Sequence, residues 1–140
     1  MSMQHGTAVS RNGRAALLLG SSGAGKSRLA LQLMAYGADL VADDAVGLNL
    51  AGRSVILSCA PSIKGMIEAR GVGLLTVNVI DKAALAIVVD LDKTAHTRLP
   101  ALEAHSILGV KFPLISGKDN PNLAAIVWCL LGGGQILPLD

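Results

Sequence analysis

Residues 20–27 have the sequence Gly20-Ser21-Ser22-Gly23-Ala24-Gly25-Lys26-Ser27. This stretch fits the phosphate-binding loop (Walker A) pattern, in which two glycines five positions apart are followed by Lys and then by Ser or Thr. Glycine allows the backbone to approach an anion closely, so that several N–H groups can point at a pyrophosphate. The pattern predicts that Lys26 reaches the outer phosphates and that the Ser27 hydroxyl binds Mg²⁺.

The sequence on either side of this loop supports the same interpretation. Residues 14–19 are a short apolar run that predicts a buried strand leading into the loop. After the loop, apolar residues recur at helical spacing as far as Gly37, where a helix is expected to stop. Strand, loop and helix therefore follow one another in the order that places phosphates at a helix N-terminus. The alternative is a glycine-rich turn that binds nothing.

Composition favours one α/β domain over residues 1–140. The chain is 51% hydrophobic and 16% charged, with one Trp, one Tyr and one Phe, so aliphatic side chains must fill its core. Aliphatic runs between helical segments are typical of a sheet buried by helices. We therefore expect a single domain containing the phosphate-binding loop, with a mixed central sheet flanked by helices.

Charge and cysteine usage exclude several classes of protein. The net charge is +2 and no basic cluster is present, so a nucleic-acid partner is not expected. The N-terminus lacks the pattern of a secretion signal, which predicts a cytoplasmic protein. The apolar run 123–131 is too short to span a membrane. Cys59 and Cys129 are isolated and predict neither a disulfide framework nor a metal site.

Turn and periodicity signals give a coarse order of elements for the rest of the chain. An Asn-Gly turn at residues 12–13 predicts a hairpin joining a strand at 7–10 to the strand at 14–19, and the first four residues are expected to be a tail. The other predictions are strands at 39–42, 46–50, 54–58, 74–79, 85–91 and 110–114, an exposed loop or short helix at 60–73, a helix at 100–108, and a final helix capped by Asn120 and Pro121 that ends near Gly132.

Two adjacent carboxylates follow the predicted strand 39–42. Asp43 and Asp44 lie 17 and 18 residues after Lys26. In a parallel sheet the C-terminal ends of the strands share one edge, so this pair is expected to face a nucleotide held by the loop. One carboxylate can then hold metal-bound water while the other accepts a proton. The alternative is an ordinary polar turn after a strand.

Four motifs occur in one order along the chain. They are His5-Gly6, the loop 20–27, Leu40-Val41-Ala42-Asp43-Asp44, and Ile67-Glu68-Ala69-Arg70-Gly71-Val72-Gly73. This combination resembles the catalytic domain of the HPr kinase/phosphorylase family, and the similarity extends into residues 123–127. The family phosphorylates a serine of HPr, a small phosphocarrier of the bacterial sugar phosphotransferase system, with ATP or pyrophosphate. Many members reverse the reaction with inorganic phosphate.

The resemblance implies a role for each matching residue. Asp43 would be the acid/base that takes the proton from the serine hydroxyl, with His5 nearby to orient it or tune its charge. Asp44 would assist or hold metal. The resemblance further implies that Ser27 and Glu68 bind Mg²⁺, consistent with the preference of this ion for hard oxygen donors. It also implies that Arg70 stabilises the transferring phosphoryl group or helps to place the segment that carries Glu68 and Arg70.

The chain departs from the family pattern before the last helix. Typical members have Arg-Pro-Gly-Arg-Asn there, whereas this chain has Ile115-Ser116-Gly117-Lys118-Asp119. The first arginine is absent and Lys118 replaces the second. Lysine is a point charge and not a bidentate fork, which predicts weaker phosphate handling in the reverse reaction. Typical members also have a separate N-terminal domain, so this chain resembles the short form of the family.

The resemblance therefore implies an ATP-dependent protein-serine kinase that acts on an HPr-like phosphocarrier with Mg²⁺. It also implies a homo-oligomer built as a multi-subunit ring, such as a hexamer. Two alternatives stay open on the residues alone. One is a small-molecule kinase or simple NTPase, which would release phosphate without a protein acceptor. The other is a nucleotide-sensing module, which would bind ATP without turnover.

Overall fold

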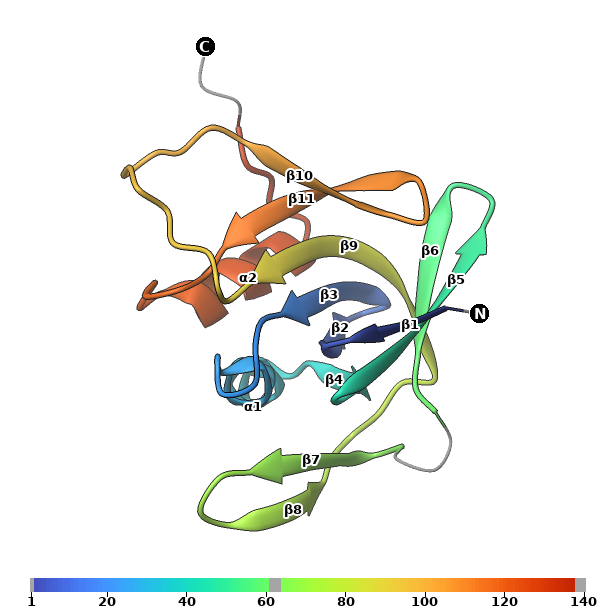
Figure 1. The fold of residues 1–140 in the computed structure, drawn as a ribbon. Helices are drawn as coiled ribbons and strands as arrows, with labels where there is room; N and C mark the ends of the chain where they lie inside the picture. The colour runs from blue at the N-terminus through green and yellow to red at the C-terminus, as the bar shows by residue number, and fades with distance from the viewer. Residues whose placement is uncertain (1, 61–63, 138–140) are drawn as a thin grey trace.

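The computed structural model describes residues 2–60 and 64–137. This part of the chain forms a nine-stranded sheet, a two-stranded sheet and two helices (Figure 1). The strands are β1 (Ser2–His5), β2 (Thr7–Arg11), β3 (Arg14–Leu19), β4 (Asp39–Ala42), β5 (Ala45–Ala51), β6 (Ser54–Ser58), β7 (Met66–Ala69), β8 (Gly73–Thr76), β9 (Lys82–Asp90), β10 (Glu103–Ile107) and β11 (Val110–Ser116). The helices are α1 (Lys26–Tyr36) and α2 (Leu123–Leu131).

The large sheet is mixed, as predicted. Its strand order is β1-β5-β6-β9-β3-β2-β4, with β11 added to β9 and β10 added to β11. Strand β9 is parallel to β3 and to β11, whereas β2 is antiparallel to both β3 and β4. Because β2 reverses the direction twice, β3 and β4 run the same way and end at the same edge of the sheet. This edge therefore carries both the phosphate-binding loop and Asp43.

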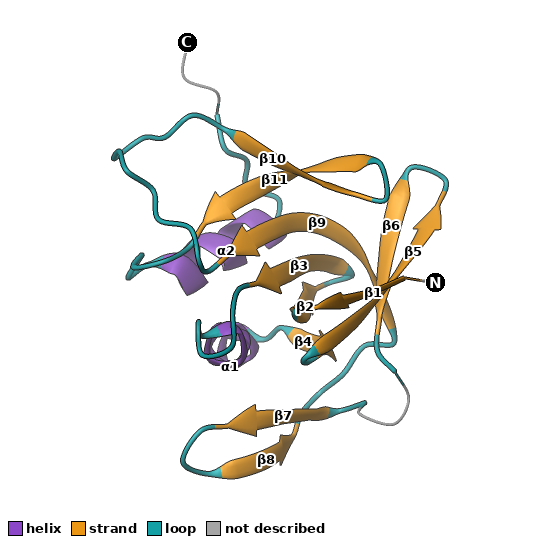
Figure 2. Ribbon diagram, in the orientation of Figure 1, coloured by secondary structure: helices purple, strands orange, loops and turns teal. Residues whose placement is uncertain are grey.

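The sheet separates two apolar cores. In β3, Ala16 and Leu18 face a core that both helices cover, whereas Ala15 and Leu17 face a second core. The second core is closed by the curl of the sheet itself, with residues of β5, β6, β10 and β11 packed against the central strands (Figure 2). Because successive side chains of a strand point to opposite faces of the sheet, β3 contributes residues to both cores. Both helices lie on one face of the sheet.

Helix α1 begins and ends at glycines, in agreement with the sequence. Gly25 precedes it with a φ of 105°, and Gly37 follows it with a φ of 121°, both in the region that glycine favours. Leu29, Ala30 and Leu33 are buried against the sheet, as their spacing predicts. The helix therefore starts directly at the phosphate-binding loop. In the described ranges, neither helix is long and apolar enough to cross a membrane.

Two arginines from the β2–β3 hairpin hold the C-terminal end of α2. The guanidinium of Arg11 donates a hydrogen bond from Nη1 to the carbonyl oxygen of Trp128 at 2.9 Å and lies 4.1 Å from the centre of the Trp128 ring. Arg14 donates from Nε to the carbonyl oxygen of Leu131 at 3.1 Å. Cations near a helix C-terminus interact favourably with the helix dipole and with the carbonyl oxygens of the last turn. These contacts fasten α2 to the hairpin that feeds the loop.

Replacing Arg11 with Ala is expected to lower the free energy of unfolding by about 2 kcal/mol, since a charged hydrogen bond and a cation–π contact are both lost. Denaturant unfolding followed by circular dichroism measures this change. Arg53→Ala serves as the control, because Arg53 is exposed in the turn between β5 and β6. Equal stability of the two variants would show that Arg11 does not anchor the helix.

Two segments predicted as irregular are strands. Residues 2–4, expected as part of a tail, form β1 together with His5 and pair with β5, with His5 opposite Ala45. Their polar composition gives no periodic signal, and the strand exists through its backbone pairing. Residues 66–69, within the segment expected as a loop or short helix, form β7. Its residues alternate, with Met66 and Glu68 exposed and Ile67 and Ala69 buried. Residues 61–63 of that segment lie outside the described ranges.

The helix predicted at 100–108 is wrong, because residues 103–107 form β10. The two-residue turn Leu108-Gly109 has φ angles of 50° and 81°, as in hairpin turns that need positive φ, and it folds β10 onto β11. Tertiary pairing therefore overrides the local helical pattern. The last helix starts later than predicted, because Asn120 uses its side-chain Oδ1 to accept a hydrogen bond from the N–H of Asn122, and α2 begins at Leu123.

Candidate active site

The phosphate-binding loop joins the end of β3 to the start of α1, as its sequence predicts. A Cβ atom at Gly20 would lie 2.9 Å from the Cβ of Ala24 and 3.2 Å from the Cβ of Leu91, closer than side chains pack. Glycine is therefore required where the loop leaves the strand. The loop and the following helix N-terminus together present backbone N–H groups at the edge of the sheet.

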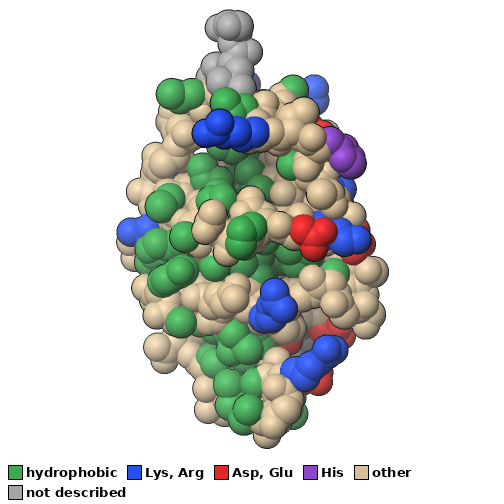
Figure 3. Space-filling model, turned by 90° about the vertical axis from the view of Figure 1, so that its left-hand side faces the viewer, with side chains coloured by type: hydrophobic (Ala, Val, Ile, Leu, Met, Phe, Trp, Pro, Cys, Tyr) green, Lys and Arg blue, Asp and Glu red, His purple; other side chains and the backbone are tan. Residues whose placement is uncertain are grey.

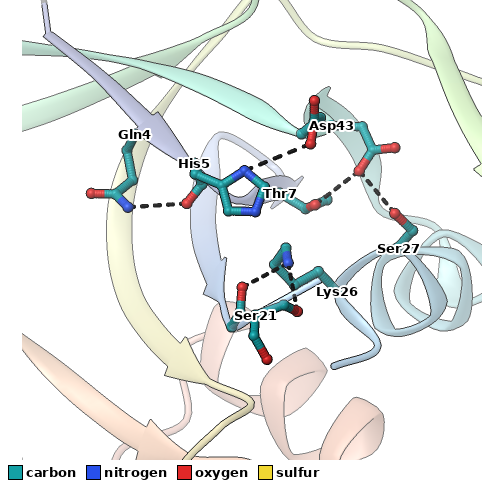
Figure 4. Close-up of polar contacts among 9 residues, drawn as sticks. Gln4, His5, Thr7, Ser21, Lys26, Ser27 and Asp43 are labelled. Atoms are coloured by element: carbon teal, nitrogen blue, oxygen red, sulfur yellow. Dashed lines mark hydrogen bonds and ion pairs between the residues drawn. The ribbon is translucent and has the colours of Figure 1, made fainter. Parts of the chain in front are cut away.

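Lys26 folds back over its own loop. Its Nζ donates hydrogen bonds to the carbonyl oxygens of Gly20 at 2.7 Å and of Ser21 at 3.1 Å (Figure 4). The side chain is 9% exposed, which makes Lys26 the one charged residue among the buried residues of the described chain. A buried ammonium held by neutral carbonyls keeps its full positive charge available to an anion. The loop thus has a cation fixed against its own backbone.

Asp43 reaches this loop from the end of β4. Its Oδ1 accepts a hydrogen bond from the hydroxyl of Ser27 at 3.0 Å and another from the hydroxyl of Thr7 at 2.8 Å. Figure 4 shows the three side chains converging beside the start of α1. Thr7 is fully buried, so its hydroxyl is a fixed donor. One oxygen of Asp43 is therefore held in place, and within the described residues its Oδ2 makes no hydrogen bond.

Asp44 points to a different partner. Its Oδ1 lies 3.6 Å from Nδ1 of His5, and both side chains are largely exposed. The backbone of Asp44 has a φ of 72°, which turns its side chain away from the direction taken by Asp43. The two adjacent carboxylates therefore contact different groups: Asp43 contacts Ser27 and Thr7, and Asp44 contacts His5. The structure brings His5 to Asp44 and not directly to Asp43.

The donors beside the loop fit a magnesium ion that also binds phosphate. Ser27 and Asp43 supply a hydroxyl and a carboxylate within hydrogen-bond distance of each other. Mg²⁺ in phosphate sites takes one or two such protein oxygens and completes its shell with substrate and water. Over residues 2–60 and 64–137, no group of three or more His, Cys, Asp or Glu side chains is arranged as a metal site. The protein donors therefore suit a metal that arrives with a nucleotide.

Glu68 and Arg70 lie on the β7–β8 hairpin, apart from the Ser27–Asp43 pair. This hairpin packs through Ile67 onto the core that contains α1, and Figure 1 shows it beyond that helix. Glu68 and Arg70 are exposed. In the described chain neither side chain makes a hydrogen bond or an ion pair with Ser27 or Asp43. Their predicted roles need the hairpin to approach a bound ligand.

A cleft of about 670 Å³ opens on the other side of the loop. Its walls come from the loop, from α1 and from the turn before α2, and its floor includes Leu29, Leu91 and Leu123. Lys118 lies on its rim, which places this predicted residue beside the loop. Figure 3 views the molecule from the left-hand side of Figure 1, and there charged side chains stand singly or in small groups among hydrophobic side chains, uncharged polar side chains and backbone.

The sequence analysis did not identify two residues that hold the site in place. Thr7 binds Asp43, and Asp92 binds Ser21 through both its backbone N–H and its hydroxyl. Asp92 closely follows the apolar strand β9, as Asp43 follows β4. The same reasoning that selected Asp43 could therefore have selected Asp92. For Thr7 the only indication was its position two residues after His5.

Cys59 lies close enough to Asp43 for the Asp43 carboxylate to affect the pKa of the thiol. Burial raises the pKa of the Cys59 thiol above its usual value, the Lys64 ammonium opposes this shift, and the Asp43 carboxylate adds to it. A raised pKa keeps the thiol protonated at neutral pH and makes it a poor nucleophile. Cys59 is therefore a reporter of the Asp43 charge.

Iodoacetamide is expected to alkylate Cys59 more slowly than free cysteine at neutral pH. In Asp43→Asn the rate should rise about twofold, because removal of the negative charge lowers the pKa of the thiol. Peptide mass spectrometry measures the rate, with the exposed Cys129 as an internal reference. A Cys59 rate that does not change relative to Cys129 would show that Asp43 does not influence this thiol.

Comparison with known proteins identifies what this chain is similar to. Residues 1–118 match the family model described as the HPr Serine kinase C-terminal domain. An HPr kinase/phosphorylase of Prosthecochloris aestuarii is 36% identical over 138 residues, covering 88% of this chain and 41% of that protein. One from Caldicellulosiruptor bescii is 36% identical over 139 residues, covering 89% and 45%. The chain thus spans less than half the length of these relatives.

A solved structure shares the fold. The Hpr(Ser) kinase/phosphatase from Coxiella burnetii superposes with a TM-score of 0.81 over 95% of this chain and 95% of that one, at 24% sequence identity. At this identity the likeness concerns the arrangement of the elements. The mixed sheet curled around one core and covered by two helices on its other face is therefore an arrangement that a second, distant sequence also adopts.

Proposed function

This chain belongs to the HPr serine kinase C-terminal domain family, and from that premise we propose that it transfers the terminal phosphate of ATP to a serine of an HPr-like phosphocarrier protein. Residues 1–140 would act as one catalytic domain. The observation that carries the proposal is the hydrogen bond between Ser27 and Asp43, because it places a carboxylate at the loop that would hold the phosphates. Phosphoryl transfer needs these two elements together.

Asp43 is proposed as the acid/base. Its Oδ1 is occupied by the hydroxyls of Thr7 and Ser27, so its Oδ2 is the oxygen that takes the proton from the incoming serine hydroxyl. Fixing one oxygen orients the other, and a positioned base typically contributes a factor of about 10² to 10⁴ in rate. Lys26 turns from the carbonyls of its own loop toward the phosphates and neutralises charge there.

Ser27 would hold Mg²⁺ together with the phosphates, with Glu68 as the second metal ligand that the family resemblance implies. The Ser27 hydroxyl donates its proton to Asp43, which leaves its lone pairs for a cation. When bound, Mg²⁺ supplies charge stabilisation to the phosphate oxygens.

The remaining predicted residues are proposed to act from the rim of the site. Arg70 would stabilise the transferring phosphoryl group once the β7–β8 hairpin approaches, and Lys118, which lines the cleft, would bind phosphate on that side of the loop. His5 would act on Asp43 through Asp44, the side chain that it contacts. The proposal includes reverse phosphorolysis that is weaker than in family members with arginine at the Lys118 position, because lysine binds phosphate at one point.

The nucleoside of ATP is proposed to bind in the cleft beside the loop. Asp43 lies on the β2–β4 side of β3, whereas the cleft lies on the β9–β11 side. A phosphate chain that crosses the loop would therefore have the nucleoside at one end and Asp43 at the other. An apolar floor with a polar rim suits a flat heterocycle and a ribose.

Filling this cleft is expected to weaken the binding of ATP but not that of pyrophosphate, which has no nucleoside. Ala124→Trp places a bulky ring where Ala124 lines the cleft, and it is expected to weaken ATP binding at least about tenfold while leaving pyrophosphate binding unchanged. Calorimetric titration measures both affinities. Ala125→Trp is the matched control, because Ala125 is the next residue of α2 and is exposed. Equal losses for both ligands would contradict a nucleoside site in the cleft.

The test of the proposed function is transfer of labelled γ-phosphate from ATP to a purified HPr-like protein in the presence of Mg²⁺. One labelled serine in the acceptor is the expected result. Phosphate release that does not need the acceptor would instead indicate an NTPase, and tight ATP binding without turnover would indicate a sensor. A homo-oligomer in the cytoplasm is part of the proposal, and sedimentation of the purified chain measures its assembly.

A further inference from the structure

Asp92 holds the first turn of the phosphate-binding loop at two points. Its Oδ2 accepts a hydrogen bond from the backbone N–H of Ser21 at 2.8 Å, and its Oδ1 accepts one from the Ser21 hydroxyl at 2.9 Å. A carboxylate that accepts two hydrogen bonds from one residue fixes the orientation of that residue as well as its position. Ser21 is therefore held by a side chain from the turn that follows β9.

The turn that carries Asp92 is itself fixed. The N–H of Asp92 donates to Oδ1 of Asp90 at 2.9 Å, and the N–H of Leu91 donates to the carbonyl oxygen of Leu19 at 2.8 Å. The carbonyl oxygen of Lys93 accepts a hydrogen bond from the N–H of Lys118 at 2.9 Å. One short turn thus joins the end of β3, the loop and the segment with Lys118.

Lys26 is the second group that holds the first turn of the loop. Its ammonium binds the carbonyl oxygens of Gly20 and Ser21, whereas Asp92 binds the N–H and the hydroxyl of Ser21. When polyphosphate binds, the ammonium turns toward it and its hold on these carbonyls weakens. Asp92 is then the main contact that keeps Ser21 in place.

We propose that Asp92 is a positioning residue of the loaded loop: it fixes Ser21 while Lys26 is engaged with phosphate, and it thereby sets the affinity for polyphosphate. This inference rests on the proposed function, since it requires that the loop binds phosphate. Its effect should appear in ligand affinity and not in the stability of the ligand-free chain, in which Lys26 still holds the turn.

The direction in which the Kd changes when Asp92 is removed distinguishes a positioning role from a purely electrostatic one. Asp92 is negative and lines the cleft beside the loop, so through charge alone its removal would tighten the binding of an anion. Positioning predicts the opposite, because a loop that must be ordered on binding binds more weakly. Asp92→Ala is therefore expected to raise the Kd for pyrophosphate about tenfold, the scale of a lost charged hydrogen bond.

Asp92→Asn should rescue the affinity. The asparagine Oδ1 can accept from the Ser21 N–H, and its amide can donate to the Ser21 hydroxyl, so both contacts survive without the charge. The Kd of this variant is expected to equal that of the unmodified chain or to fall below it. Glu103→Gln is the control. Oε2 of Glu103 lies 2.6 Å from Nζ of Lys93, the residue next to Asp92, and within the part of the chain that the structure describes Glu103 makes no hydrogen bond with the loop.

Calorimetric titration with inorganic pyrophosphate and Mg²⁺, with thermal unfolding of each ligand-free variant, tests the inference. Support is a raised Kd in Asp92→Ala alone, with an unfolding midpoint within a few degrees of the unmodified chain. An unchanged Kd, a Kd raised equally in Asp92→Asn, or a fall in ligand-free stability that accounts for the loss would each overturn it. If the unmodified chain binds pyrophosphate but phosphorylates no acceptor, only the proposed function fails. If it binds no phosphate, both fail.

Discussion

Asp43→Asn is expected to lower the rate of phosphate transfer at least about a thousandfold, within the range that a general base supplies. The affinity for ATP should stay within about threefold of the unmodified value, because the asparagine Oδ1 can still accept hydrogen bonds from Thr7 and Ser27. If Asp43 is the base as proposed, the change removes only the capacity to take a proton from the acceptor serine. Single-turnover transfer to an HPr-like protein, together with ATP titration, measures the two quantities separately.

Asp44→Asn provides the comparison for this variant. Asp44 is the neighbouring carboxylate, it is exposed, and it contacts His5 and not the loop. Its replacement is expected to reduce the rate by a much smaller factor. Similar rates for Asp43→Asn and the unmodified chain would show that Asp43 is not the base, and equal losses for the two variants would assign the role to the pair.

Lys26→Met is expected to weaken ATP binding by about a hundredfold or more. Methionine has a similar length and no charge, so the variant removes the ammonium from a site that is 9% exposed. A cation in such a water-excluded site interacts with phosphate more strongly than it does in bulk solvent. Transfer activity should be lost together with binding, in contrast to Asp43→Asn. Titration with ATP and with pyrophosphate measures the loss.

Lys111→Met is the matched control, because Lys111 is exposed on β11. Its affinity for ATP should equal that of the unmodified chain. If Lys26→Met binds ATP as tightly as Lys111→Met does, the loop does not bind the phosphates and the proposed site is wrong.

The loop and the carboxylate after β4 were predictable from sequence because both rest on local patterns. Glycine spacing, the apolar run before the loop and the periodicity of α1 each act within about fifteen residues. The reason given for bringing Asp43 to the loop was only partly right. Strand β4 is not a parallel neighbour of β3, and it reaches the same edge because β2 lies antiparallel between them.

Strands that depend on distant partners could not be predicted. Residues 2–5 are strand because β5 lies beside them, and residues 103–107 are strand because the Leu108-Gly109 turn folds them onto β11. The pattern of apolar and polar residues within each segment does not by itself specify a strand. The same limit hid Asp92, whose contact with Ser21 joins residues 71 positions apart.

The central claim is that a polyphosphate in the loop has its terminal phosphate beside Asp43. A crystal structure of the chain with Mg²⁺ and a non-hydrolysable ATP analogue tests this claim most directly. We expect the phosphates to contact Lys26 and the loop N–H groups, the terminal phosphate to face Oδ2 of Asp43, and the nucleoside to occupy the cleft. An analogue whose terminal phosphate lies on the cleft side of the loop, away from Asp43, would contradict the account.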